Sequence, residues 1–242
     1  MIDVKSKARE VNERGYCILE AVYNEDECQR MRVALESLCD ERGGLTPDIA
    51  HRTFHPFLPL RPEMGPFFAK VEVVETITEV LQDDVRFAHS GGRVSGEYPK
   101  PFMMPWHNHY SWEIPPGGLN RSKPERIICN IYVDGSTPEV GQLVVLPRSL
   151  NDPIDQPFQD QWVDWPGQTV VYAPPGSVVI FDTALWHTAK RGNRPGYRHL
   201  CGGHYQGWHN TKPHHEDNNS DSPGLAQYKR DLSVLHRLID GP

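Results

Sequence analysis

The sequence predicts a mainly β protein in which helices flank a single β-core closed as a sandwich or barrel. From about residue 84 onward, short apolar or alternating runs are separated by Pro, Gly, Asp and Asn, which is typical of strands joined by turns. Gly and Pro account for 20 and 22 of the 242 residues, which favours many short elements. No repeat or low-complexity tract breaks the pattern. We therefore expect one domain over 1–242, with a helical part at about 1–83, the β-core at about 84–208 and a C-terminal loop and helix at about 209–242.

The first part of the chain carries helix signals. GYCILEAV, after a glycine, predicts a short strand. Asn24 stands before three acidic residues and a run with helical apolar spacing, so it predicts an N-cap and a helix that ends at Gly43-Gly44. Residues 45–66 contain five prolines and are expected to form an extended loop. A second helix is expected over 67–81.

The second part carries strand signals. Six runs predict the core strands: VRFAHSG, RIICNIYV, QLVVLP, QTVVYAP, SVVIFD and HLCGGHY. Pro175-Gly176 predicts the turn before SVVIFD, and His187 is expected to start the return strand. The polar stretch 209–224 indicates a flexible loop, and a last helix is expected over 225–239.

Composition argues against several function classes. The formal net charge of −7 and the pI of about 5.9 disfavour a nucleic-acid binder. Five widely spaced cysteines without a CxxC pair indicate free thiols in a reducing compartment. No apolar run approaches the roughly 20 residues of a membrane span, and the charged N-terminus lacks a signal-peptide core. A cytoplasmic protein without a membrane or nucleic-acid partner is expected. The sequence leaves its oligomeric state open.

The stretch WHNHYSWE, residues 106–113, predicts a metal centre. Side chains two apart on an extended segment share a face, so His107 and His109 can reach one ion. His187, on another predicted strand, can lie opposite His107 in a β-core. Two histidines from separate strands, a further ligand and open positions are typical of non-heme Fe(II) sites that activate oxygen. The alternative is a solvent-facing histidine pair on an edge strand.

Four segments carry a family resemblance. They are GYCILEAVYNEDECQRMRVAL, WHNHYSW, IYVDGSTPEVGQLVVLPRSL and PPGSVVIFDTALWHTAKRGNRPGYR. In order and spacing they resemble the opening strand and helix, the W-H-x-D-type segment, the Gly-strand-Pro-x-Ser stretch and the distal His and Arg of the phytanoyl-CoA dioxygenase family. These proteins are Fe(II)/2-oxoglutarate oxygenases with a double-stranded β-helix core, a jelly-roll similar to that of cupins. The resemblance touches most of residues 15–208.

The resemblance implies roles for particular residues. His107 would be the first iron ligand, His187 the last, and Arg198 the partner of the distal carboxylate of 2-oxoglutarate. A planar, permanently charged guanidinium suits that carboxylate. Apart from the resemblance, Asn130 and Tyr132 on the expected strand RIICNIYV would line the pocket if their side chains point inward. The implied cofactors are Fe(II), 2-oxoglutarate as co-substrate and O2, and the implied activity is hydroxylation or another oxidation of a small molecule.

One departure concerns the middle ligand. The family's usual Asp is His109 here. His109 can itself be a ligand, or Glu113 can supply the carboxylate, because HNHYSWE resembles the His-x-His-x3-Glu part of the cupin motif. In a third alternative neither binds and water fills the position. A neutral ligand holds Fe(II) less tightly than a carboxylate does. PRSL also replaces the family's Pro-Gly-Ser-His turn, and we expect that turn to lie away from the metal.

Other readings of these residues stay open. One is a three-His or His-His-Glu metal dioxygenase that does not use 2-oxoglutarate. Another is a catalytically inactive β-sandwich binding protein, which the His109 departure favours. Arg191 and Arg194 compete with Arg198, but their loop positions predict solvated side chains. Strand alternation places Trp106 and Trp112 on the face opposite the histidines.

Overall fold

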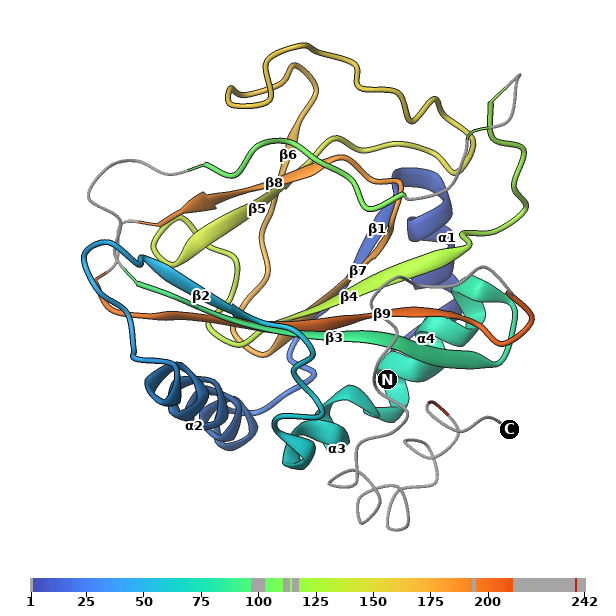
Figure 1. The fold of residues 1–242 in the computed structure, drawn as a ribbon. Coiled ribbons are helices and arrows are strands. Elements are labelled where there is room, and N and C mark those ends of the chain that lie inside the picture. The colour runs from blue at the N-terminus through green and yellow to red at the C-terminus, as the bar shows by residue number, and fades with distance from the viewer. Residues whose placement is uncertain are drawn as a thin grey trace.

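A computed structural model describes residues 2–96, 103–110, 114, 118–192, 195–210 and 238 (Figure 1). Two antiparallel sheets face each other across the core. The larger has the order β1-β7-β4-β9-β3-β2 and the smaller the order β6-β5-β8. The strands are β1 Tyr16–Leu19, β2 His51–Phe54, β3 Val85–Ser95, β4 Arg126–Tyr132, β5 Gly141–Val145, β6 Thr169–Val171, β7 Ser177–Asp182, β8 His187–Arg191 and β9 Arg198–Gly207. This is the predicted double-stranded β-helix, and all six predicted core runs form strands.

The helices pack on the outer face of the larger sheet (Figure 1). They are α1 Val4–Arg14, α2 Glu25–Glu41, α3 Gly65–Phe68 and α4 Val71–Leu81, with a 3-10 turn at Pro62–Met64. Met31, Leu35 and Leu38 of α2 are buried in the main apolar core. The predicted start of α2 is confirmed, because the Asn24 side chain accepts a hydrogen bond from the Glu27 N–H and completes a capping box.

Two predictions for residues 45–81 need correction. The expected helix over 67–81 is two helices, because Lys70 has a non-helical ψ of 123°. Its Nζ lies 2.7 Å from Glu27 Oε1 and above the Tyr23 ring, so this break ties α4 to α2. The expected loop over 45–66 contains β2, which pairs with β3 from His51↔Ser95 to Phe54↔Gly92. Its four residues among prolines are too short a run to show strand periodicity.

Some expectations fall outside the described residues. These include most of the loop over 209–224 and, apart from Leu238, the helix over 225–239. All five cysteines are free and buried, which confirms the predicted free thiols. In the described part of the chain, no helix has the length and apolarity needed to cross a membrane.

Candidate metal centre

Three histidines converge at one end of the smaller sheet, where His187 is buried, His107 is half-buried and His109 is exposed. The segment carrying His107 pairs with β8 through reciprocal hydrogen bonds. The His107 N–H donates to the His187 carbonyl at 3.0 Å, and the His187 N–H donates to the His107 carbonyl at 2.9 Å. The His109 N–H donates to the Thr183 carbonyl at 2.8 Å, in the β7–β8 turn. One ring nitrogen from each of the three imidazoles lies within 4.8 Å of the other two.

The ring nitrogens of two of these histidines have defined roles. His107 Nδ1 lies 2.8 Å from the Pro105 carbonyl, and His187 Nδ1 lies 2.9 Å from the Leu185 carbonyl. A carbonyl only accepts, so each Nδ1 carries the proton and each Nε2 keeps its lone pair for a metal. Burial lowers the pKa of His107. Burial, and then the neighbouring His107 and His109, lower the pKa of His187 well below its usual value. The rings are therefore neutral, as metal ligation requires.

A buried ion cluster holds the turn that precedes His187. Asp182 Oδ2 lies 2.7 Å from Arg121 Nη2 and 3.6 Å from Arg148 Nη1. Asp182 Oδ1 accepts a hydrogen bond from the Ala184 N–H at 3.1 Å. Arg148 belongs to the PRSL turn, which we expected to lie away from the metal with a local effect alone. That expectation was too narrow, because Arg148 contacts Asp182, next to the Thr183 carbonyl that receives His109.

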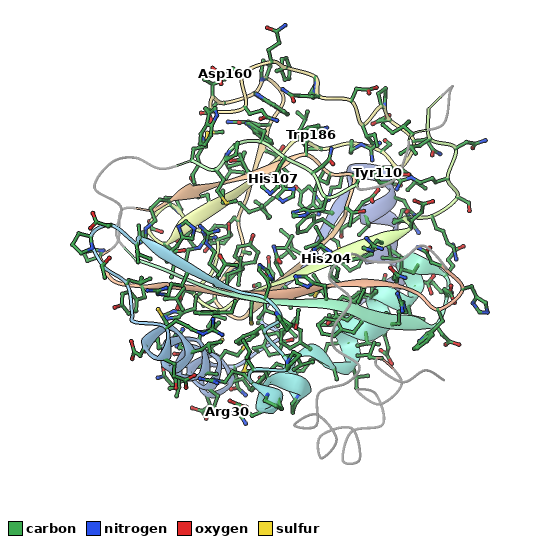
Figure 2. All side chains as sticks on the ribbon, in the orientation of Figure 1. Arg30, His107, Tyr110, Asp160, Trp186 and His204 are labelled. Atoms are coloured by element: carbon green, nitrogen blue, oxygen red, sulfur yellow. The ribbon has the colours of Figure 1, made fainter. Side chains whose placement is uncertain are left out.

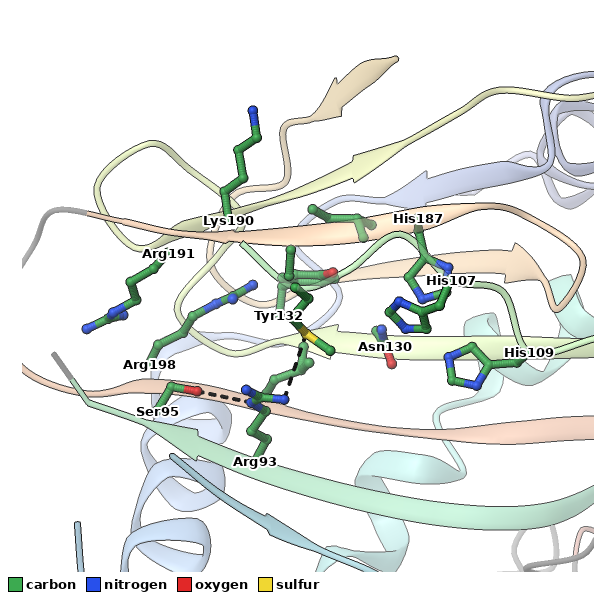
Figure 3. A pocket seen from close by; sticks show the side chains of 14 residues that line it. Arg93, Ser95, His107, His109, Asn130, Tyr132, His187, Lys190, Arg191 and Arg198 are labelled. Carbon is green, nitrogen blue, oxygen red and sulfur yellow. Dashed lines mark hydrogen bonds between the residues drawn. The ribbon is translucent and has the colours of Figure 1, made fainter. Parts of the chain in front are cut away.

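Deeper in the core, the triad opens into a cavity of about 200 Å³ (Figure 3). Asn130 and Tyr132 of β4 line it, and burial raises the pKa of the Tyr132 hydroxyl to about 12. Arg198, at the start of β9, points into the same cavity. Its Nε is enclosed and has no hydrogen-bond partner in the part of the chain that the structure describes. A buried donor without an acceptor is costly, so this cavity suits an anionic guest.

The other predicted residues divide into three groups. Arg191, which we expected on a loop with a solvated side chain, is instead the last residue of β8, half-buried, and lines the same cavity as Arg198. Its Nη1 and Nη2 donate to the Val140 and Gly196 carbonyls, at 3.1 and 3.0 Å. Trp106 lies on the face opposite the histidines, as predicted, and stacks on Trp165 with ring centroids 4.5 Å apart. The residues Glu113, Trp112 and Arg194 lie outside the described residues.

Sequence reasoning missed two charged residues of the cavity, Lys190 of β8 and Arg93 of β3. Arg93 points into the cavity beside Arg198 (Figure 3). Arg93 Nε donates to Ser95 Oγ at 3.2 Å, and Nη1 lies 3.9 Å from Met104 Sδ. The sequence signal was a lone arginine within the apolar and glycine run FAHSGGRVSG.

A double-stranded β-helix with converging histidines and an arginine with an enclosed Nε in one cavity is typical of the class of non-heme iron oxygenases that use 2-oxoglutarate. The family model of phytanoyl-CoA dioxygenase (PhyH) matches residues 11–200, so the chain belongs to this family, whose members depend on Fe(II), 2-oxoglutarate and O2. No curated protein matches the sequence significantly.

Solved structures share the fold. HygX from Streptomyces hygroscopicus, with nickel and 2-oxoglutarate bound, is 17% identical with a TM-score of 0.67, over 84% of this chain and 87% of that chain. SnoK, an alpha-ketoglutarate-dependent carbocyclase from nogalamycin biosynthesis, is 20% identical with a TM-score of 0.67, over 84% of both chains. EctD from S. alaskensis, with 2-oxoglutarate and 5-hydroxyectoine, is 19% identical with a TM-score of 0.63, over 87% and 79%. At these identities the likeness establishes the fold.

Proposed function

We propose that His107, His109 and His187 hold the Fe(II) of a 2-oxoglutarate-dependent oxygenase in this chain. The observation that carries the proposal is the sharing of one cavity by three convergent imidazoles and the enclosed Nε of Arg198. The donor set fits, because neutral imidazole nitrogens are good ligands for Fe(II) and the Nδ1 hydrogen bonds fix two of the rings.

The residues deeper in the cavity would hold the co-substrate. Arg198 would receive the distal carboxylate of 2-oxoglutarate, since its guanidinium is a permanent cation with an unused donor. Tyr132 supplies a neutral hydroxyl and Asn130 supplies an amide, and both can donate a hydrogen bond to an oxygen of 2-oxoglutarate. Leu143 and Leu200 offer apolar surface to its methylene groups. These contacts would orient the keto-acid toward the triad and exclude water.

When bound, iron supplies the oxidising chemistry, in which 2-oxoglutarate and O2 become succinate and CO2 while the substrate is oxidised, typically by hydroxylation. The chain contributes position and charge. The backbone bonds between the His107 segment and β8 set the ring separation, and Arg198 sets the direction of the co-substrate. The same neutral triad also suits a dioxygenase that does without 2-oxoglutarate, which is the second candidate.

The cavity, the net charge and the cysteines support a substrate class and a cellular compartment. The cavity beside the triad suits a small-molecule substrate. The net charge of −7 gives no support to a nucleic-acid substrate. Five free cysteines support a reducing compartment, and we place the protein in the cytoplasm as part of this proposal.

An anaerobic titration tests the proposal. Fe(II) is added to purified protein, then 2-oxoglutarate, and the visible charge-transfer band of a bidentate keto-acid on iron is followed. A band in the wild type supports the co-substrate. Repeating the titration with His109→Ala and Glu113→Ala identifies the middle ligand as the variant that loses the band. Bound iron without a band favours the dioxygenase that does without 2-oxoglutarate. No bound iron favours the inactive binding protein.

A further inference from the structure

A second cavity adjoins the first beside His109 and His187. Five residues line both, namely Arg93, His109, Asn130, His187 and Leu200. The second cavity reaches over β3 and β9, where Gly91 lies opposite Gly202 in the sheet. A Cβ at Gly91 would lie 2.8 Å from His55 Cε1, so the missing side chain makes room for that ring. A ligand here would lie against the triad without entering the Arg198 end of the first cavity.

A row of imidazoles forms one wall of this second cavity. The rings of His55 and His89 stack with centroids 4.8 Å apart. The His89 ring lies 5.3 Å from that of His204, which lies 5.4 Å from that of His109. His204 projects from β9 into the space between the sheets (Figure 2). His55 and His109 are exposed and His89 is buried, so the row connects one exposed ring, through a buried one, to the candidate metal ligand His109.

The charge of the two cavities is one-sided. The described residues that line them include no Asp or Glu, although the whole chain is acidic. The contacts of Arg93 are with a hydroxyl and a thioether, so no carboxylate among the described residues neutralises it. Bound 2-oxoglutarate would bring two negative charges against four cations, of which Lys190 is paired with Asp164; the other three are Arg93, Arg191 and Arg198. The charge of a metal on three neutral imidazoles then stays uncompensated, where an aspartate ligand would have reduced it.

We propose that the oxidised substrate is a small carboxylic acid that binds in the second cavity with its carboxylate beside Arg93. This inference rests on the proposed function and adds its substrate class. The guanidinium fork binds a planar carboxylate bidentately. Ile128, Phe181 and Leu200 pack against the carbon skeleton. The substrate's single negative charge thereby takes the place of the charge that an aspartate ligand would have supplied.

Matched probes test the substrate class by calorimetry on protein loaded with Ni(II), which binds without turnover. Binding of 2-oxoglutarate is recorded first and then saturated. Benzoate is compared with benzamide, and hexanoate with hexanamide, because each pair differs in charge and little in shape. We expect each carboxylate to bind at least about tenfold more tightly than its amide. Arg93→Gln should reduce that preference to less than about threefold. Arg93→Lys should keep part of it.

Gly91→Ala is the control that tests whether the probes bind in the second cavity, which Gly91 lines. It displaces the His55 ring and leaves Arg93 intact, so it should weaken the carboxylate and the amide alike. Equal affinity of acids and amides in the wild type, a preference that survives Arg93→Gln, or no effect of Gly91→Ala on either probe would overturn the proposal. Tighter binding of phenyl phosphate than of benzoate would overturn the choice of a carboxylate. Failure of 2-oxoglutarate to bind at the outset would overturn the proposed function as well.

Discussion

His107 and His187 exchange both of their backbone hydrogen bonds, and their imidazole centroids lie 4.3 Å apart. In an antiparallel ladder, such a pair faces across the sheet with side chains on the same side. The spacing of the two candidate ligands is therefore set by strand pairing. A centre built in this way keeps its geometry without the metal, so the apo-protein should offer a preorganised site.

The ligand at position 109 can be tested by restoring charge. His109→Asp adds a carboxylate next to the metal, which at a few ångströms contributes on the order of 1 kcal/mol or more. We expect Fe(II) affinity to rise by about tenfold in His109→Asp and to fall by more than about tenfold in His109→Ala. Competition with a coloured chelator under anaerobic conditions measures both. Equal affinities in all three proteins would show that position 109 is not a ligand.

Arg198→Gln should weaken 2-oxoglutarate binding by about thirtyfold or more, because the variant loses a charge-assisted bidentate contact. Arg198→Lys keeps the charge and should recover part of the loss. Arg191→Gln is the matched comparison, since Arg191 lines the same cavity but directs Nη1 and Nη2 to backbone carbonyls. Its effect should stay below about threefold. Calorimetry on the metal-loaded proteins gives the dissociation constants, and a larger effect of Arg191→Gln would reverse the two assignments.

Asp182 should support both folding and metal binding. Asp182→Asn leaves Arg121 and Arg148 buried without their carboxylate, and removing one partner of a buried pair costs about 3 kcal/mol or more. Urea unfolding measures this loss of free energy. Fe(II) affinity of the folded variant should also fall, because the turn that receives His109 loosens. The control is Asp164→Asn at the exposed pair with Lys190, which should cost less than about 1 kcal/mol.

Acid stability should depend on Asp134. Burial raises the pKa of this carboxyl, but hydrogen bonds and charge from His199, and a hydrogen bond from Arg32, outweigh burial and hold the pKa at about 2. The unfolded value is 3.8, so the unfolded chain binds the proton first as the pH falls. The contribution, about 2 kcal/mol, is present above pH 4 and disappears between about pH 4 and pH 2. Urea midpoints at pH 5, 4 and 3 should fall less steeply in Asp134→Asn than in wild type. Parallel slopes would contradict the assignment.

The parts of the fold that follow from local periodicity were predictable. The alternating runs gave the strands of the core, and the Asn24 signature gave the start of α2. The position of His107 opposite His187 also followed, because both lie on extended segments and strands of a closed core must pair. The place of Arg198 came from resemblance, since its spacing from His187 has no meaning without the family.

Features that depend on distant contacts were not predictable. Asp182 forms ion pairs with Arg121 and Arg148, which are distant in the sequence, so no local sequence pattern predicts these contacts. The role of Arg93 depends on which strand lies beside β3, and that neighbour is β9, more than a hundred residues later. The short strand β2 exists because it extends the sheet edge at β3, whereas its own sequence is weak.

The buried cysteines can report transient opening of the protein core, because their thiols become reactive when they are exposed. Burial raises the pKa of Cys17 to about 12 and of Cys28 to about 11, and it also raises those of Cys129 and Cys201. Thiolate is the reactive form, so these sulfurs resist alkylation while the core is closed. Each alkylated thiol then records an excursion from the native state. Mass-resolved alkylation can time such excursions with and without metal, using no substrate and no assay of turnover.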